Sequence, residues 1–175
     1  MEPRARLKPV KEFRIYKRNL PHWELPGSVY FITFRTAKDF TLSDSAKDIV
    51  LSSFNFHAGK KYKLHTCVIM DTHVHCILQP LEKSGGKAPA ETSGAPGAYY
   101  SIAQIMHSIK SYSANRIQRI LDVKGRIWQD ESYDRIIRNE EEYLEKMNYI
   151  ANNPLKAMIV EKPEDYRWLF VEGLG

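Results

Sequence analysis

Two apolar runs that are separated by two residues constrain the fold of this chain most strongly. They extend from Tyr62 to Met70 and from His73 to Pro80. Runs of this length with so short a connection are typical of an antiparallel β-hairpin. Both faces of the two runs carry apolar side chains, so we expect the hairpin to lie in the middle of a sheet.

The two cysteines of the chain lie on opposite arms of this hairpin. If the turn centres on Asp71 and Thr72, then Cys67 and Cys76 lie opposite one another, close enough for a bridge to be considered. They have neither the CxxC spacing nor the His cluster of a zinc finger, and disulfides are rare in a reducing compartment. We therefore expect free, buried thiols.

Composition places the chain in one broad class. Of its 175 residues, 43% are apolar and 27% are charged, which is typical of a single globular domain. Such a domain buries about 70% of its unfolded surface and requires no structural metal. No apolar segment approaches the roughly 20 residues that cross a bilayer, and the N-terminus lacks a signal-like core, so we expect a cytoplasmic protein with no membrane partner.

The patterns along the chain predict one α+β domain over residues 1–175. It would have a basic N-terminal segment at about 1–22 and a flexible loop rich in Gly, Ala, Pro and Ser at about 82–98. The expected elements are a strand at 28–36, a helix at 42–56, the hairpin, a long amphipathic helix from 102 to about 124, an extended segment at 126–137 and a final helix that Asn139 caps and Pro154 ends. This order favours an antiparallel sheet.

A His-Val-His sequence lies on the second arm of the hairpin. Because strand side chains alternate, His73 and His75 project from one face while Val74 points to the other. Imidazole is a frequent metal ligand, so the pair is a candidate metal site. A solvated strand face or two hydrogen-bonded core histidines would give the same short pattern.

The final helix carries a tyrosine on its polar side. Its apolar stripe consists of Tyr143, Met147 and Ile150, whereas Tyr149 lies about 150° away from the centre of this stripe. Asn153 follows one turn later on the same side. A phenol and an amide oxygen therefore point in one direction, although an ordinary exposed helix face would show the same spacing.

Three segments together resemble a known family. VIMDTHVHCIL, IWQDESYDRIIRNEEEY and above all YIANNPLKAMIV are similar to single-tyrosine HUH transposases, most closely the REP-associated tyrosine transposases of bacteria. The resemblance extends from about Val29 to Trp168. An HxH pair followed some 75 residues later by Tyr-Ile-x-x-Asn-Pro-x-Lys-Ala is a specific combination.

The resemblance implies a fold, an activity and a set of site residues. The fold would be a ferredoxin-like antiparallel sheet with helices. His73, His75 and Asn153 would bind Mg²⁺ or Mn²⁺, and Tyr149 would attack a phosphodiester to leave a 5′-phosphotyrosine. The partner would be single-stranded or hairpin DNA formed by repetitive extragenic palindromes, with the protein at the nucleoid when DNA is bound. The sequence leaves open whether the protein is a monomer or a homodimer.

The sequence departs from relatives at two places, which affect loops rather than the proposed nucleophile and the three proposed metal ligands. Asp71 and Thr72 stand where relatives usually have Pro followed by Asn or Glu, and Arg167 and Leu169 replace a common Pro and Ser near the C-terminus. Two other functions also remain open from sequence: a metal-dependent nuclease that activates water, and an inactive DNA-binding module.

Basic residues on and after the long helix are candidates for DNA contacts. The net charge of +5 makes a polyanionic partner plausible without requiring one. Trp128 or Tyr133 could stack on a base, although a tryptophan such as Trp128 is more often a core residue. Lys146 could favour ionisation of the Tyr149 phenol or contact phosphate, or it could pair with Glu142 on a solvated face. The candidate DNA-binding residues are Lys110, Arg116, Arg119, Arg126, Arg135, Arg138 and Lys146.

Overall fold

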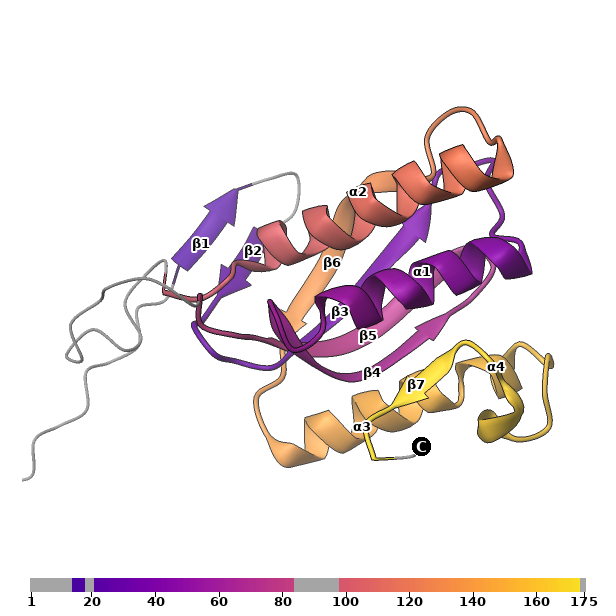
Figure 1. Cartoon of the computed structure of the whole chain (residues 1–175). Helices are drawn as coiled ribbons and strands as arrows, with labels where there is room; N and C mark the ends of the chain where they lie inside the picture. The colour runs from indigo at the N-terminus through magenta and orange to yellow at the C-terminus, as the bar shows by residue number, and fades with distance from the viewer. Residues whose placement is uncertain (1–13, 18–20, 84–97, 174–175) are drawn as a thin grey trace, which may run out of the picture.

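A computed structural model describes residues 14–17, 21–83 and 98–173 (Figure 1). Most of the expected basic segment and flexible loop therefore lies outside the described residues. The elements are β1 (Arg14–Lys17), β2 (Pro21–Glu24), β3 (Tyr30–Thr36), α1 (Asp44–His57), β4 (Tyr62–Ile69), β5 (His73–Pro80), α2 (Ile102–Leu121), β6 (Trp128–Ile136), α3 (Glu140–Ala151), α4 (Asn153–Lys156), the 3-10 helix η2 (Pro163–Asp165) and β7 (Leu169–Val171).

The main sheet has five strands in the order β6-β3-β5-β4-β7, and every neighbouring pair is antiparallel. The β4–β5 hairpin lies in its interior, as its two apolar faces predict. β1 and β2 form a separate two-stranded sheet. The expected α+β fold with an antiparallel sheet is confirmed.

Helices cover both faces of the main sheet. Figure 1 shows α1 and α2 on one face and α3 on the other. Alternation along β3 directs Phe34 toward the α1–α2 side, where it packs against Phe54 and Trp128, and directs Phe31 toward α3. The large core lies between the sheet and the helix pair, and the site described below lies on the opposite face.

The hairpin arms meet in the predicted register. Cys67 pairs with Cys76 in the ladder, and both are buried free thiols. Burial raises the pKa of the Cys67 thiol to about 12, which makes it unreactive near neutral pH. Within the described ranges, no helix is both long and apolar enough to span a bilayer.

Candidate active site

The hairpin presents its two histidines side by side on the face that α3 covers. The ring centroids of His73 and His75 are 4.9 Å apart. Val74, between them, is fully buried on the opposite face. The turn is closed by the amide of Met70, which donates to the carbonyl of His73 over 2.8 Å. The predicted alternation is confirmed.

Helix α3 places a phenol next to this pair. The helix begins after Asn139, whose side chain accepts a hydrogen bond from the amide of Glu142, as expected for an N-cap. Ile150 is its buried residue, and the adjacent Tyr149 remains 38% exposed. The Tyr149 Oη lies 3.5 Å from the His75 Nε2.

The short helix α4 places Asn153 at the other histidine. Its side-chain Oδ1 lies 3.4 Å from the His73 Nε2. The sequence predicts that Pro154 ends the final helix, but in the structure it does more than that. Helix α3 ends at Ala151, and the buried Pro154 lies in the first turn of α4, where its missing N–H group has no helical partner to lose. All four candidate residues thus meet within one chain.

Burial keeps both imidazoles neutral. It is the main cause that lowers the pKa of His75 to about 3, with further lowering by His73 and Arg35. Burial also lowers the pKa of His73, against the raising effects of Asn153 and Asp71. A neutral imidazole has a free nitrogen lone pair, which is the form that binds metal ions.

Two further side chains shape the site and have no motif of their own. Thr33 pairs with His75 in the β3–β5 register, and its Oγ1 lies 2.7 Å from the His75 Nδ1. Phe31 stacks on His75 at a centroid distance of 5.8 Å and meets Tyr149 edge-on at 6.1 Å. The alternation of β3 could have indicated which of its residues share a face, but only the strand pairing identifies their neighbours.

The donor set suits a divalent ion with mixed ligands. Two imidazole nitrogens and one amide oxygen lie together at this site. Carbonyl-type oxygen suits Mg²⁺ and Mn²⁺, whereas a pair of imidazoles favours borderline divalent ions such as Mn²⁺ or Zn²⁺. Within residues 21–83 and 98–173, no group of three or more His, Cys, Asp and Glu side chains could hold a metal. The Asn153 Oδ1 is the oxygen donor that lies beside the histidine pair.

Several of the basic candidates contact other protein groups. The Lys110 ammonium donates to the carbonyls of Gln129, Asp130 and Glu131. Arg116 donates to the Tyr112 hydroxyl. Three other candidates form ion pairs with acidic side chains: Arg126 with Asp130, Arg135 with Glu142 and Lys146 with Glu145. Arg119 and Arg138 are exposed. Contacts of these residues with DNA remain predictions.

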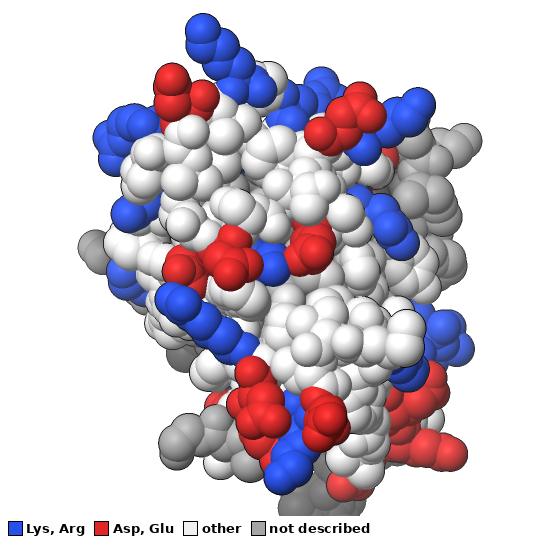
Figure 2. Space-filling view, turned by 90° about the vertical axis from the view of Figure 1, so that its right-hand side faces the viewer, with Lys and Arg blue, Asp and Glu red and all other residues white. Residues whose placement is uncertain are grey.

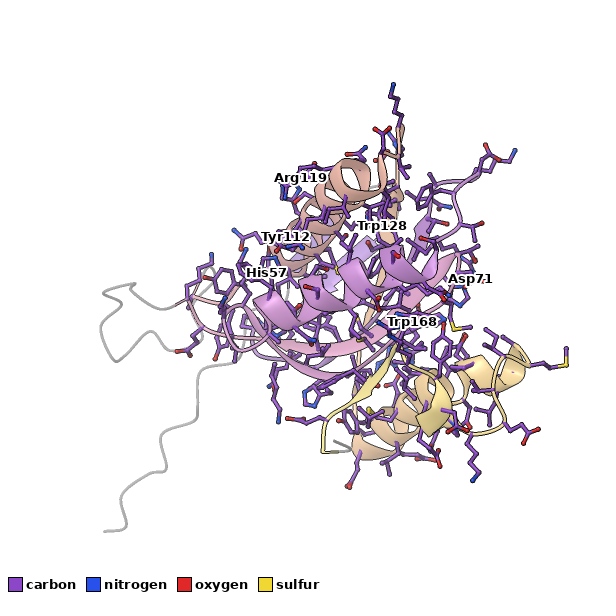
Figure 3. All side chains as sticks on the ribbon, turned by 45° about the vertical axis from the view of Figure 1, so that its right-hand side comes forward. His57, Asp71, Tyr112, Arg119, Trp128 and Trp168 are labelled. Atoms are coloured by element: carbon purple, nitrogen blue, oxygen red, sulfur yellow. The ribbon has the colours of Figure 1, made fainter. Side chains whose placement is uncertain are left out.

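The two stacking candidates, Trp128 and Tyr133, differ in their exposure to solvent. Trp128 is only 5% exposed, and its Nε1 donates to the Ser113 hydroxyl beneath α2 (Figure 3). Of the two alternatives for this residue, a stacking ring and a core ring, the structure therefore shows the core ring. Tyr133 is 49% exposed, which leaves a stacking role open to it.

The two departures from the family pattern meet at α1. Asp71 pairs with the buried Lys47, and the Lys47 ammonium lies 4.2 Å from the ring of Trp168. Arg167 and Trp168 both donate to the neighbouring Asp48. Asp71 and Trp168 are labelled in Figure 3. The hairpin turn and the C-terminal segment are thus connected through α1.

Charges on the face shown in Figure 2 are mixed. Acidic and basic side chains are interspersed with neutral ones there, a group of acidic side chains lies near the middle of the face, and no continuous basic patch covers it. Attraction of a polyanion to this face would therefore be local.

Comparisons with known proteins bear on the fold. The fold resembles that of a REP-associated tyrosine transposase solved in complex with a REP hairpin, with a TM-score of 0.64 and 18% identity over 88% of this chain and 80% of that one. A protein of Haemophilus influenzae with no described function is 33% identical over 97 residues, so the match spans about half of each chain, 50% and 52%. No protein-family model matches the sequence. The chain therefore shares the fold of that transposase, an antiparallel sheet with helices on both faces.

Proposed function

We propose that this protein is a metal-dependent enzyme that cuts and rejoins single-stranded DNA through a covalent bond to Tyr149. One observation carries the proposal: the exposed Tyr149 hydroxyl lies 3.5 Å from the Nε2 of His75, in a chain with this fold. A tyrosine that served only as packing would bury its ring, and its hydroxyl would not face a histidine pair.

The reaction exchanges one phosphodiester bond for another. The Tyr149 Oη attacks phosphorus and forms a 5′-phosphotyrosine, while the P–O3′ bond breaks and its electron pair leaves with the 3′ oxygen. The phenol proton passes to solvent, and the 3′ oxygen takes up a proton from solvent. Because an ester bond is retained, the reverse reaction can join the DNA to a new 3′-hydroxyl without ATP.

Each residue at the site has a separate task. His73, His75 and Asn153 would hold the divalent ion. When bound, that ion supplies a positive charge for the phosphate oxygens, which assists a phenol that is a weak nucleophile near neutral pH. Phe31 packs against both His75 and Tyr149 and limits the orientations of the two rings. A monomer contains all of these groups.

The substrate we propose is single-stranded DNA that folds into a hairpin. The structural neighbour was solved with a REP hairpin, and the exposed arginines after α2 offer phosphate contacts for such a stem. We expect the protein to act at the nucleoid, in the cytoplasm.

A two-label experiment tests this function. The substrate is a pool of hairpin oligonucleotides with randomised single-stranded flanks, labelled with Cy5 at the 5′ end and fluorescein at the 3′ end, incubated with Mn²⁺. We expect a denaturation-resistant protein band that carries fluorescein alone, together with a free Cy5 fragment. Release of both labels as free fragments would indicate hydrolysis, and intact DNA would indicate a binding module; either result contradicts the proposal.

A further inference from the structure

A lysine lies on the same helical stripe as the phenol and the amide. Tyr149, Asn153 and Lys156 are spaced by four and then three residues, which places them on one side of the α3–α4 segment despite the break at Asn152. The Lys156 ammonium lies 4.9 Å from the centroid of the Tyr149 ring. The stripe thus ends in a positive charge beside the phenol.

The Lys156 side chain is available to a ligand. It is exposed, and within the described part of the chain no Asp or Glu forms an ion pair with it. The neighbouring cations differ in this respect, because Lys146 pairs with Glu145 at 2.8 Å and Arg135 pairs with Glu142 at 2.8 Å. A cation–π contact of this kind is weak at an exposed site, so an incoming phosphate can readily replace it.

We propose that Lys156 is a catalytic residue of the transesterification proposed above, and that its ammonium group binds a non-bridging oxygen of the scissile phosphate. The inference rests on that proposed function. It assigns to this chain a positive charge of its own beside the ring that carries the attacking oxygen.

A positive charge on the phosphate assists the reaction, in addition to the charge that the divalent ion would supply. The diester carries one negative charge, and the attacking phenol adds another as it loses its proton. Histidine ligands bind metal ions in the neutral form, and an amide is neutral, so the three metal-binding side chains supply no positive charge. An ammonium group on the phosphate stabilises the transition state, in which charge accumulates on the non-bridging oxygens.

The rejoining step uses the same contact. A 3′-hydroxyl attacks the phosphotyrosine, and the electron pair of the P–Oη bond returns to Tyr149. Lys156, bound to the phosphate, also stabilises the departing phenolate, which then takes up a proton from solvent. Lys156 transfers no proton in either direction, so its contribution depends on charge rather than on its own titration.

Single-turnover kinetics with three variants test the proposal. Lys156→Met keeps the length of the side chain and removes its charge, Lys156→Arg keeps the charge, and Lys162→Met is the control at an exposed lysine nearby. The probe is the 3′-fluorescein hairpin pool with Mn²⁺ at saturating protein concentration, and fluorescence anisotropy measures DNA affinity separately. Thermal melting of each variant checks that it is folded.

We expect Lys156→Met to lower the rate constant of adduct formation about 100-fold at saturation. Lys156→Arg should stay within about tenfold of the wild type, and Lys162→Met should match it. An unchanged rate constant in Lys156→Met, or a loss confined to DNA affinity, overturns the inference while the wild-type adduct still supports the proposed function. A wild-type protein that forms no adduct contradicts the proposed function, and the inference fails with it.

Discussion

The Thr33 Oγ1 and the His75 Nδ1 lie 2.7 Å apart, across a register pair that joins β3 to β5. This contact leaves the other ring nitrogen, Nε2, directed at the Tyr149 hydroxyl. A metal ion on Nε2 requires the ring proton on Nδ1, and that N–H group then donates to Thr33. A residue without any motif thus sets the orientation of a proposed metal ligand.

Thr33→Val tests this relationship, because valine keeps the shape of the side chain and removes the hydrogen-bond acceptor. We expect Mn²⁺ affinity to fall about 10- to 100-fold, as is typical when a metal ligand loses its hydrogen-bond partner. Thr33→Ser should retain most of the affinity. Calorimetric titration measures both, and equal affinity in Thr33→Val and the wild type would contradict the assignment.

The proposed ligand set predicts a loss of metal binding at each position. His73→Ala and Asn153→Ala should each weaken Mn²⁺ binding at least tenfold, because each removes one of three donors. His107→Ala is the matched control, since His107 is exposed on α2. If the same calorimetric titration gives the wild-type affinity in both site variants, the metal site is wrong.

The contacts of Phe31 predict that a substitution there affects activity beyond its effect on the stability of the fold. Phe31→Leu and Phe54→Leu each shorten a buried aromatic, and we expect each to lower the free energy of unfolding by about 1 to 2 kcal/mol. Only Phe31 contacts both His75 and Tyr149, so only its variant should also slow adduct formation. Urea unfolding and a cleavage assay measure the two effects; equal loss of activity in both variants would argue against a positioning role.

The burial of His57 predicts that the stability of the fold depends on pH. Its imidazole is buried against Tyr112 at the end of α1, and its Nε2 has no hydrogen-bond partner. Burial, together with Lys61 and Lys60, lowers its pKa in the folded state below the unfolded value of 6.5. The unfolded chain therefore binds the proton more readily, and stability falls as the pH drops below about 6.5.

His57→Gln should reduce this dependence. The other histidines with a lowered pKa act in the same direction, so part of the dependence should remain. Urea midpoints at pH 7.5 and pH 5.5 measure the effect. A variant whose midpoint falls by as much as that of the wild type would show that His57 does not contribute.

Much of the fold could be predicted from local patterns. The hairpin, the long helix and the Asn139 cap depend on periodicity and on residue types within a few positions, and they lie where expected. The strand β7 could not be found in this way. Its three residues pair with β4 across about 100 positions of sequence, and the pairing is supported by the Thr66 hydroxyl, which donates to the carbonyl of Phe170.

The candidate site shows the same division. Alternation on β5 and helical spacing on α3 predicted which side chains share a face, and the structure brings these faces together. Spacing could not identify Thr33 or Phe31, because their roles arise from the pairing of β3 with β5. The sequence left two positions open for Trp128, because an aromatic next to basic residues gives no signal that separates a core ring from an exposed one, and the structure places it in the core.

The central claim is that Tyr149 forms the covalent bond to DNA. Mass spectrometry of the proteolysed adduct tests it most directly, because it identifies the residue that carries the nucleotide. We predict a 5′-phosphonucleotide on the peptide that contains Tyr149, and no adduct from Tyr149→Phe. A nucleotide attached to any other residue, or an adduct that persists in Tyr149→Phe, would contradict the account.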